Sequence, residues 1–322
     1  MSKKLITLAA SFFLVFILVA CAGTPAPAAP EPPAAEGEQP PVAEQEPEQS
    51  LGLIGFSIST LSNPFFVTME QGARSMAEQL GVDITITDAA DNVATQMSDV
   101  EDLLTAGIDV LLINPVDSAT AALIVNDALD AGIPVIAVGR AVDGADIDTF
   151  IYVNNIAAAL YATEFFIDAI GEGASVAVLE GVPGASSAID RLDGFMQAAE
   201  GRLEIATSLT ANFNRVEGLN VTENILQAHP DIVGIFAMND EMGLGAIEAA
   251  LAAGRQPGED IFITGFDATA DALAAVQAGT MLYTVDQMSG LQGATAVELA
   301  VDFMLGNGLP SLVPVDVQII AN

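Results

Sequence analysis

The sequence predicts an α/β protein with two similar lobes, each built on a doubly wound parallel sheet. From residue 51 onward, short apolar runs alternate with longer amphipathic stretches. Strand, helix, strand in regular alternation produces a parallel sheet with helices on both faces. The same alternation starts again near residue 175. Each repeat has the size of a separate domain, about 100 residues, so we expect two lobes rather than one large sheet.

The first 21 residues have the features of an export signal. Lys3 and Lys4 precede an apolar run over residues 5–20, which is shorter than the ~20 residues that a membrane-spanning helix needs. The run ends in a Leu-Val-Ala-Cys sequence that resembles the lipobox of bacterial lipoproteins. This resemblance implies that Cys21 is acylated and becomes the first residue of the mature protein. The alternative is an uncleaved anchor helix with an incidental cysteine.

Residues 22–50 are expected to form a tether. They contain 8 of the chain's 16 prolines and six glutamates, with almost no large apolar side chain. Such a composition cannot build an apolar core, so the segment is expected to stay extended.

The charge of the chain argues against one class of partner. The sequence has 43 acidic residues against 8 lysines and arginines, and a surface of that kind repels nucleic acid, whose binding requires a basic footprint. Cys21 is the only cysteine, so the chain cannot form an internal disulfide.

The first repeat has four expected strands and three expected helices. The strands are the apolar runs at 51–56, 84–86, 110–113 and 133–138, and the helices are the amphipathic stretches at 64–80, 94–106 and 119–131. Gly81, Gly107 and Gly132 follow the three helices, at the position where a left-handed residue commonly ends a helix. Residues 88–92 only loosely suggest a cation-binding loop, and we interpret them as a turn.

The second repeat has the same order of elements. Its expected strands are 175–179, 203–209, 232–236 and 261–265, and its expected helices are 189–199, 215–229 and 241–253. No segment after residue 50 approaches 18 consecutive apolar residues, so this part of the chain is expected to be soluble.

Polar and aromatic residues follow the expected strands. Open α/β sheets bind ligands beyond the carboxyl ends of their strands, and the residues there are Ser59, Asn63, Arg140, Asn239, Phe266 and Asp267. Serine, asparagine and aspartate also cap helices and start turns, so each of these can be a cap instead. Arginine and phenylalanine are not capping residues, which favours a binding cleft between the lobes.

Six motifs identify the family that the chain resembles. They are Ser-Thr-Leu-Ser-Asn-Pro-Phe-Phe at 59–66, Leu-Leu-Ile-Asn-Pro at 111–115, Ile-Pro-Val-Ile at 133–136, Gly-Leu-Asn-Val at 218–221, Asn-Asp-Glu-Met at 239–242 and Gly-Phe-Asp at 265–267. Together they resemble the ribose-binding protein family of type I periplasmic binding proteins, the substrate-binding proteins of ABC transporters. The resemblance covers nearly all of residues 51–322.

The resemblance implies a domain organisation. In that family the chain crosses between the lobes three times, so each lobe is discontinuous and a three-stranded hinge joins them around a ligand cleft. Mapped onto this sequence, one lobe is 51–153 plus 288–313 and the other is 154–287 plus 314–322.

The resemblance also implies the ligand-binding residues. Ser59 and Asn63 match a polar pair, Phe65 and Phe66 two aromatics, and Arg140 and Arg191 two arginines that face each other. The remaining matches are Phe213, Asn239, Phe266, Asp267 and Gln287. Aromatic rings suit the apolar faces of a sugar, and arginine, aspartate and amide side chains suit its hydroxyl rim. Phenylalanines at such positions more often belong to the core, and the resemblance overturns this for Phe66 and Phe213 more firmly than for Phe65 and Phe266.

One position departs from the family. Where the family has an aspartate directly before the first arginine, this chain has Gly139. Two arginines then face only Asp267, so either a neighbouring group or water balances the second positive charge, or the ligand differs from ribopyranose. In the second case, Gly139→Asp is expected to strengthen ribose binding.

An enzyme is not expected. The only histidine, His229, follows an expected helix end, where a capping or dipole role suits it. With one histidine and one lipid-committed cysteine, no Ser-His-Asp, Cys-His or histidine-based zinc site can be assembled. Residues 171–173 do not match a phosphate-binding or dinucleotide fingerprint. We therefore expect no cofactor and no metal.

The expected function is that of an extracytoplasmic, lipid-anchored solute-binding protein. It binds a small pentose or hexose, closes, and delivers the sugar to an ABC transporter permease with its ATPase, as a monomer that contacts the membrane only through its lipid. The alternative is a sensor that presents the sugar to a chemoreceptor or membrane kinase. A sugar-responsive repressor would need an N-terminal helix-turn-helix, and a hydrolase lacks the catalytic groups.

Overall fold

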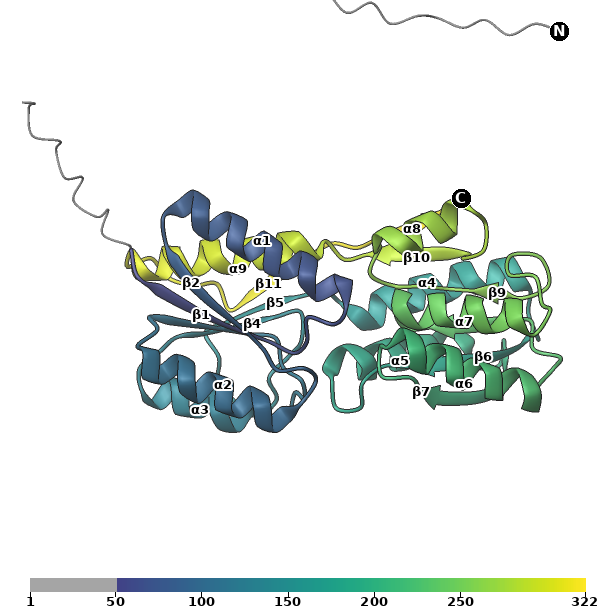
Figure 1. The fold of residues 1–322 in the computed structure, drawn as a ribbon, viewed down its shortest axis with the longest axis horizontal. Helices are drawn as coiled ribbons and strands as arrows, with labels where there is room; N and C mark the ends of the chain where they lie inside the picture. The colour runs from purple at the N-terminus through teal and green to yellow at the C-terminus, as the bar shows by residue number, and fades with distance from the viewer. Residues whose placement is uncertain (1–50) are drawn as a thin grey trace, which may run out of the picture. The chain divides into compact units, whose positions relative to one another are not determined.

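The computed structural model describes residues 51–322, which belong to one compact unit. The expected signal, Cys21 and the expected tether at 22–50 lie outside the described residues. The described part contains two lobes of parallel strands covered by helices (Figure 1). This confirms the predicted α/β class.

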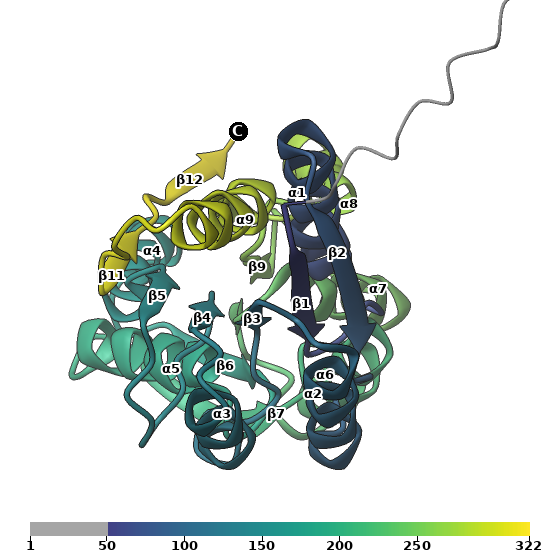
Figure 2. The same ribbon diagram turned by 90° about the vertical axis from the view of Figure 1, so that its left-hand side faces the viewer.

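The first lobe is built on a six-stranded parallel sheet. Its strand order is β11-β5-β4-β3-β1-β2, with β1 at Leu53–Ile58, β2 at Asp83–Asp88, β3 at Val110–Ile113, β4 at Val135–Val138, β5 at Thr149–Tyr152 and β11 at Leu312–Pro314. Helices α1 (Pro64–Leu80) and α9 (Ser289–Met304) cover one face, and α2 (Val93–Ala106) and α3 (Ala121–Asp130) cover the other (Figure 2). The buried strands form the centre of two apolar clusters, one under each pair of helices.

Glycines allow α1 and α9 to approach closely. A Cβ on Gly72 would lie 2.1 Å from the carbonyl oxygen of Gly290, and a Cβ on Gly293 would lie 2.0 Å from that of Met69. The helix that follows β10 is therefore packed directly against the first helix of the chain. This fixes the position of the segment that carries Gln292.

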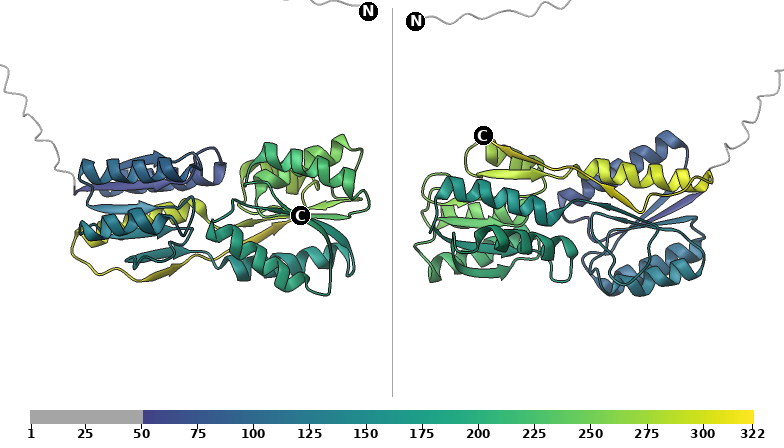
Figure 3. Two further views of the ribbon diagram at one scale, coloured as in Figure 1. Left: turned by 90° about the horizontal axis from the view of Figure 1, so that it is seen from below. Right: turned by 180° about the vertical axis from the view of Figure 1, so that it is seen from behind.

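The second lobe contains a four-stranded parallel sheet and a small antiparallel one. The parallel order is β7-β6-β8-β9, with β6 at Ser175–Glu180, β7 at Glu204–Thr210, β8 at Gly234–Ala237 and β9 at Phe262–Ile263; β10 (Tyr283–Asp286) pairs with β12 (Gln318–Ala321). Helices α6 (Arg215–Ala228) and α7 (Asp240–Ala252) lie on one face of the parallel sheet, and α4 (Asn155–Ile170) and α5 (Ser186–Ala199) lie on the other (Figure 3). Helix α8 spans Ala270–Gln277.

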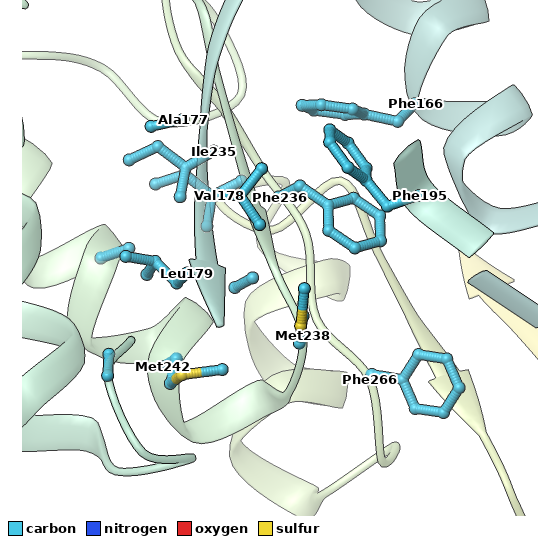
Figure 4. Close-up of a cluster of buried hydrophobic side chains, with 14 of the residues drawn as sticks. Phe166, Ala177, Val178, Leu179, Phe195, Ile235, Phe236, Met238, Met242 and Phe266 are labelled. Atoms are coloured by element: carbon cyan, nitrogen blue, oxygen red, sulfur yellow. The ribbon is translucent and has the colours of Figure 1, made fainter. Parts of the chain in front are cut away.

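Aromatic rings fill the centre of the second lobe. Phe195 and Phe236 stack with centroids 4.5 Å apart, and Phe166 lies 6.1 Å from Phe236 (Figure 4). All three side chains are buried. The same cluster extends to Phe266, which lies next to the site described below.

Three segments connect the lobes. They are the residues between β5 and α4, between β10 and α9, and between β11 and β12. Because β10 belongs to the second lobe while α9 packs on α1, the chain passes between lobes directly after Asp286.

The elements expected from the sequence are present, with ends that differ by a few residues. The strand expected at 261–265 is shorter than predicted, because only Phe262 and Ile263 form β9. The sequence reading did not assign β5, α4, α8, β10, α9, β11 or β12. Gly81, Gly107 and Gly132 have φ values of 67°, 79° and 79°, which confirms the predicted left-handed helix ends.

Candidate ligand-binding site

A cavity lies between the two lobes at the carboxyl ends of their strands. Its lining comes from both lobes and consists of Asn63, Phe65, Phe66, Asn114, Gly139, Arg140, Ser187, Arg191, Phe213, Asn239, Asp267 and Gln287. Nine of the eleven residues that the sequence reading proposed for a ligand are among them. The cavity therefore brings together three phenylalanine rings, two guanidinium groups, one carboxylate and several amides.

The other two proposed residues, Ser59 and Phe266, lie outside the lining. Ser59 is fully buried at the end of β1, and its hydroxyl has no hydrogen-bond partner in the described part of the chain. Phe266 lies under Arg191, whose guanidinium carbon is 3.7 Å from the centroid of the ring. The phenylalanine supports a residue of the cavity rather than lining it.

The sequence reading did not propose Asn114 or Ser187, and it noted Gly139 only as a departure. Asn114 directly follows β3, so the rule that selected the other strand-end residues also applies to it. Its Nδ2 donates to the carbonyl of Val138 at 2.7 Å, while its Oδ1 is buried without a partner among the described residues. Ser187 lies in the first turn of α5.

Two asparagines both cap a helix and line the cavity. The Oδ1 of Asn63 accepts from the amide of Phe65 at the start of α1. The Oδ1 of Asn239 accepts from the amide of Met242 at the start of α7, and its Nδ2 donates to the carbonyl of Phe213. The two roles that the sequence left open, cap and cavity residue, therefore coexist in these side chains.

Arg191 is held in place by the second lobe. Its Nε donates to Asn155 at 2.9 Å, its Nη1 to the carbonyl of Met238 at 2.7 Å and its Nη2 to Gln287 at 3.2 Å. Its Nη1 also lies 3.9 Å from Oδ1 of Asp267. Three fixed hydrogen bonds orient the planar group before any ligand arrives.

Arg140 makes fewer contacts with the protein. Its Nη1 donates to the carbonyl of Pro115 at 2.8 Å. Its guanidinium carbon lies 5.2 Å from the ring of Phe66 and 5.8 Å from the ring of Phe213, one ring from each lobe. Burial lowers the pKa of Arg140 to about 10. The remaining donors of this group are therefore directed at a buried, aromatic-lined space.

The carboxylate of the cavity, Asp267, is also strongly buried. Its Oδ1 accepts from Nε2 of Gln287 at 2.6 Å. Burial raises the pKa of Asp267 well above its ordinary value, although the nearby Arg191 opposes this shift. The cavity thus presents donors from arginine and acceptors from aspartate and amide groups side by side.

A second carboxylate near Arg140 was not anticipated. Asp91 lies in a crevice that adjoins the cavity and is also lined by Arg140. Its negative charge is the main influence that raises the pKa of Arg140 against the effect of burial. The second arginine charge, which the sequence left unbalanced, therefore faces a neighbouring acid at the solvent-exposed edge of the site.

The surroundings of Gly139 bear on the expectation that an aspartate there would strengthen ribose binding. Gly139 has φ 73°, a conformation that side chains rarely adopt, and a Cβ would lie 3.0 Å from Oε1 of Gln292. That oxygen has no hydrogen-bond partner among the described residues, so an added carboxylate would meet an acceptor. The φ value makes any side chain at this position strained, while Nδ2 of Asn114, a donor, would lie 3.6 Å from the same Cβ. The effect of Gly139→Asp on ribose binding stays a prediction.

The lobes contact each other on one rim of the cavity. The amide of Ser118 donates to the carbonyl of Gly184 at 3.0 Å, and the amide of Ser186 donates to Oγ of Ser118 at 3.1 Å. The amide of Ala141 donates to Oγ of Ser186 at 2.9 Å. None of these four residues lines the cavity, so these contacts between the lobes involve no side chain of the lining.

Two lobes closed over a buried cavity of rings, cations and amides define a binding protein for a small polar solute. A family model described as a periplasmic binding protein domain matches residues 54–308. The chain belongs to this family of binding proteins, as the sequence predicted.

Individual relatives agree with this assignment. The chain is 43% identical over 253 residues to the ribose import binding protein RbsB of Bacillus subtilis, a match that covers 79% of this chain and 82% of that protein. Among solved structures, the Caulobacter myo-inositol binding protein bound to myo-inositol has a TM-score of 0.81 at 34% identity and covers 86% of this chain and 96% of its own. A solute-binding protein from Actinobacillus succinogenes with bound D-allose has a TM-score of 0.78 at 31% identity. The match covers 84% of this chain and 97% of that protein.

Two further observations apply to residues 51–322. No group of three or more histidine, cysteine or acidic side chains in this part is arranged to hold a metal ion. None of its helices has the length and apolar character that a membrane span requires. His229 is the residue that ends α6.

Proposed function

We propose that the chain is the substrate-binding component of an ABC importer and that its ligand is a small sugar of the pentose or hexose class. The observation that carries this proposal is the cavity itself. Phe66 and Phe213 supply flat apolar surfaces from the two lobes, and Arg140, Arg191 and Asp267 supply hydrogen-bonding groups around them. A sugar has apolar faces and a rim of hydroxyls that donate and accept, which matches this distribution.

The solutes named for the relatives narrow the choice. For the three relatives described above they are ribose, myo-inositol and D-allose, which are ring-forming polyhydroxylated molecules with five or six carbon atoms. Oε1 of Gln292 has no partner among the described residues and would lie 3.0 Å from a Cβ on Gly139, which lines the cavity. We therefore expect this side of the cavity to favour a hydroxyl donor. We propose Ser59 and Phe266 as residues that support the binding residues from behind.

The two lobes are proposed to move as bodies. Residues 51–153 with 288–313 form one body, and residues 154–287 with 314–322 form the other, connected by the three crossing segments. Opening would separate Arg140 from Phe213 and break the rim contacts, so that the sugar enters from solvent. The closed form would then dock on a permease with its ATPase.

Export and anchoring complete the proposal. The signal at 1–21 directs the chain out of the cytoplasm, and acylated Cys21 holds the monomeric protein at the membrane by its lipid. The relatives are named as import and binding proteins, and no observation favours the sensor alternative.

The test uses the protein from which residues 1–21 have been removed. This protein is titrated in a calorimeter with D-ribose, D-allose, myo-inositol and a sugar acid. We expect micromolar or tighter binding of at least one neutral ring. If none of these solutes binds at millimolar concentration, the proposal of a sugar ligand is wrong. Labelling with radioactive palmitate in a bacterial host should mark the parent protein and not the Cys21→Ser variant.

A further inference from the structure

The loop after β9 holds two groups of the site in a strained conformation. Asp267 and Ala268 have φ values of 133° and 54°, which non-glycine residues seldom adopt. The loop carries Asp267, which lines the cavity, and Phe266, on which Arg191 stacks. Something outside the loop must hold this backbone in place.

The carboxylate of Asp240 holds the loop. Its Oδ2 accepts from the amide of Thr269 at 2.7 Å and from the hydroxyl of Thr269 at 3.0 Å, and its Oδ1 accepts from the hydroxyl of Thr284 at 2.6 Å. Thr284 in turn accepts from the amide of Ala268 at 3.0 Å. The backbone amide of Asp240 donates to the carbonyl of Phe266 at 2.9 Å. The strained turn is therefore bonded on both sides to one residue.

Asp240 is enclosed and has no contact with the cavity. It is fully buried, and a Cβ on Gly265 would lie 2.3 Å from its Oδ1, so only glycine fits there. The charges that act on Asp240 are Glu241 on its own helix, Asp267 of the loop and Arg191 of α5. Burying a carboxylate costs free energy, and the three hydrogen bonds that Asp240 accepts offset this cost. The carboxylate therefore depends on Thr269 and Thr284 as much as the loop depends on the carboxylate.

Three segments of the cavity meet at this residue. Asp240 follows Asn239, bonds to the loop of Asp267, and bonds to Thr284 of β10, which leads three residues later to Gln287. Asn239, Asp267 and Gln287 all line the cavity. One carboxylate thus sets the spacing among the second-lobe groups of the site.

We propose that Asp240 is a positioning residue of the sugar site: it fixes Asp267 and Phe266, and through them Arg191, in the arrangement that binds the ligand. This inference rests on the proposed function, since it assigns a role within that site. It predicts that weakening the anchor speeds dissociation of the sugar although no group that touches the sugar has been substituted.

The first experiment needs no ligand. Amide hydrogen exchange is measured on the ligand-free protein for the parent, Asp240→Asn, Thr284→Val and the control Thr222→Val. Thr222 is also buried in the second lobe, and its hydroxyl has no partner among the described residues, so the same chemical change there removes no hydrogen bond. We expect the amides of Ala268 and Thr269 to exchange at least tenfold faster in Asp240→Asn and Thr284→Val and unchanged in Thr222→Val.

The second experiment measures affinity and dissociation rate with the sugar of the panel that binds the parent best. Thr284→Val should weaken binding at least tenfold through faster dissociation. This variant keeps the carboxylate of Asp240, so it also tests the anchor if Asp240→Asn does not fold. Thr222→Val should stay within twofold. On an Asp267→Asn background, Asp240→Asn should add less than half of its single effect, because it acts through Asp267.

The outcomes separate the two proposals. If the parent binds a sugar and both anchor variants keep its affinity within twofold, or if the effects of Asp240→Asn and Asp267→Asn add fully, the positioning role is wrong while the sugar site stands. If exchange at Ala268 and Thr269 is unchanged in both variants, the anchor itself is wrong. If the parent binds no sugar of the panel, the proposed function fails, and the exchange rates still decide whether Asp240 holds the loop.

Discussion

Replacing Arg140 by methionine separates ligand binding from stability. Within residues 51–322, Arg140 makes a single hydrogen bond, from Nη1 to the carbonyl of Pro115, so most of its five donors are left for a ligand. Hydrogen bonds that involve a charged group contribute about 1.5–3 kcal/mol each. Two such bonds to sugar hydroxyls correspond to about 3–6 kcal/mol, so Arg140→Met should weaken binding at least 100-fold, at about 1.4 kcal/mol per tenfold.

The same substitution should not destabilise the ligand-free protein. Burial lowers the pKa of Arg140 from 12.5 to about 10, which means that the charged form is disfavoured in the folded state by about 3 kcal/mol, at 1.36 kcal/mol per pKa unit. Methionine fills the space of the apolar stem and carries no charge, so removal of this penalty offsets the loss of one hydrogen bond. We expect the free energy of unfolding in urea to be unchanged or higher.

The measurements are calorimetric titration with the best-binding sugar and urea denaturation of the ligand-free protein. The control is Arg74→Met on α1, the same substitution at an exposed arginine that pairs with Glu70 at the surface. Affinity of Arg140→Met within threefold of the parent would show that the guanidinium does not bind the sugar. A large loss of stability would show that the group is structural.

Three further predictions concern other parts of the chain. Arg191→Ala should abolish measurable sugar binding and, unlike the Arg140 variant, lower the melting temperature, because three hydrogen bonds to the second lobe are lost; affinity within threefold of the parent by calorimetry would contradict it. Deleting residues 22–50 should change neither the melting temperature nor the affinity, and a loss of several degrees would show that this segment packs on the body. Burial raises the pKa of Asp240 to about 6 from 3.8, so the folded state binds this proton more tightly than the unfolded chain. Its contribution to stability is therefore present at low pH and is lost as the pH rises from about 4 through 6, by about 3 kcal/mol. Urea denaturation at pH 5, 6 and 7 should show a smaller decline for Asp240→Asn than for the parent, and equal declines would contradict this pKa.

The sequence predicted those elements whose ends are marked by local chemistry. Strands β1 and β3 are continuous apolar runs, and α1 begins after a capping asparagine and ends at a left-handed glycine. Helix α4 was missed because alanine and large apolar residues occur on most of its sides, which hides the helical period. Strand β11 was missed because it has only three residues and is held by tertiary pairing, so no pattern of its own marks it.

For the site, the rule that ligands bind beyond strand ends selected Asn63, Arg140, Asn239 and Asp267 without the family. It also selected Ser59 and Phe266, which lie outside the lining of the cavity; both side chains are buried. Only the family resemblance indicated the four residues Phe65, Phe66, Arg191 and Phe213, together with Gln287. Phe213 illustrates the reason: it projects from a loop with φ 55°, and no periodic pattern describes such a position.

The rim contacts among Ser118, Gly184, Ser186 and Ala141 have a consequence for how affinity and selectivity are divided. They join the two lobes and use no residue of the cavity lining, so in the proposed closure their free energy would be the same whichever sugar is enclosed. Each net hydrogen bond of about 1 kcal/mol changes the ratio of closed to open protein about fivefold. Changes at the rim therefore scale the affinities for all sugars by one common factor. The ratios of the affinities for different sugars are set by the residues inside the cavity. The overall affinity can thus be altered through residues that never meet the sugar.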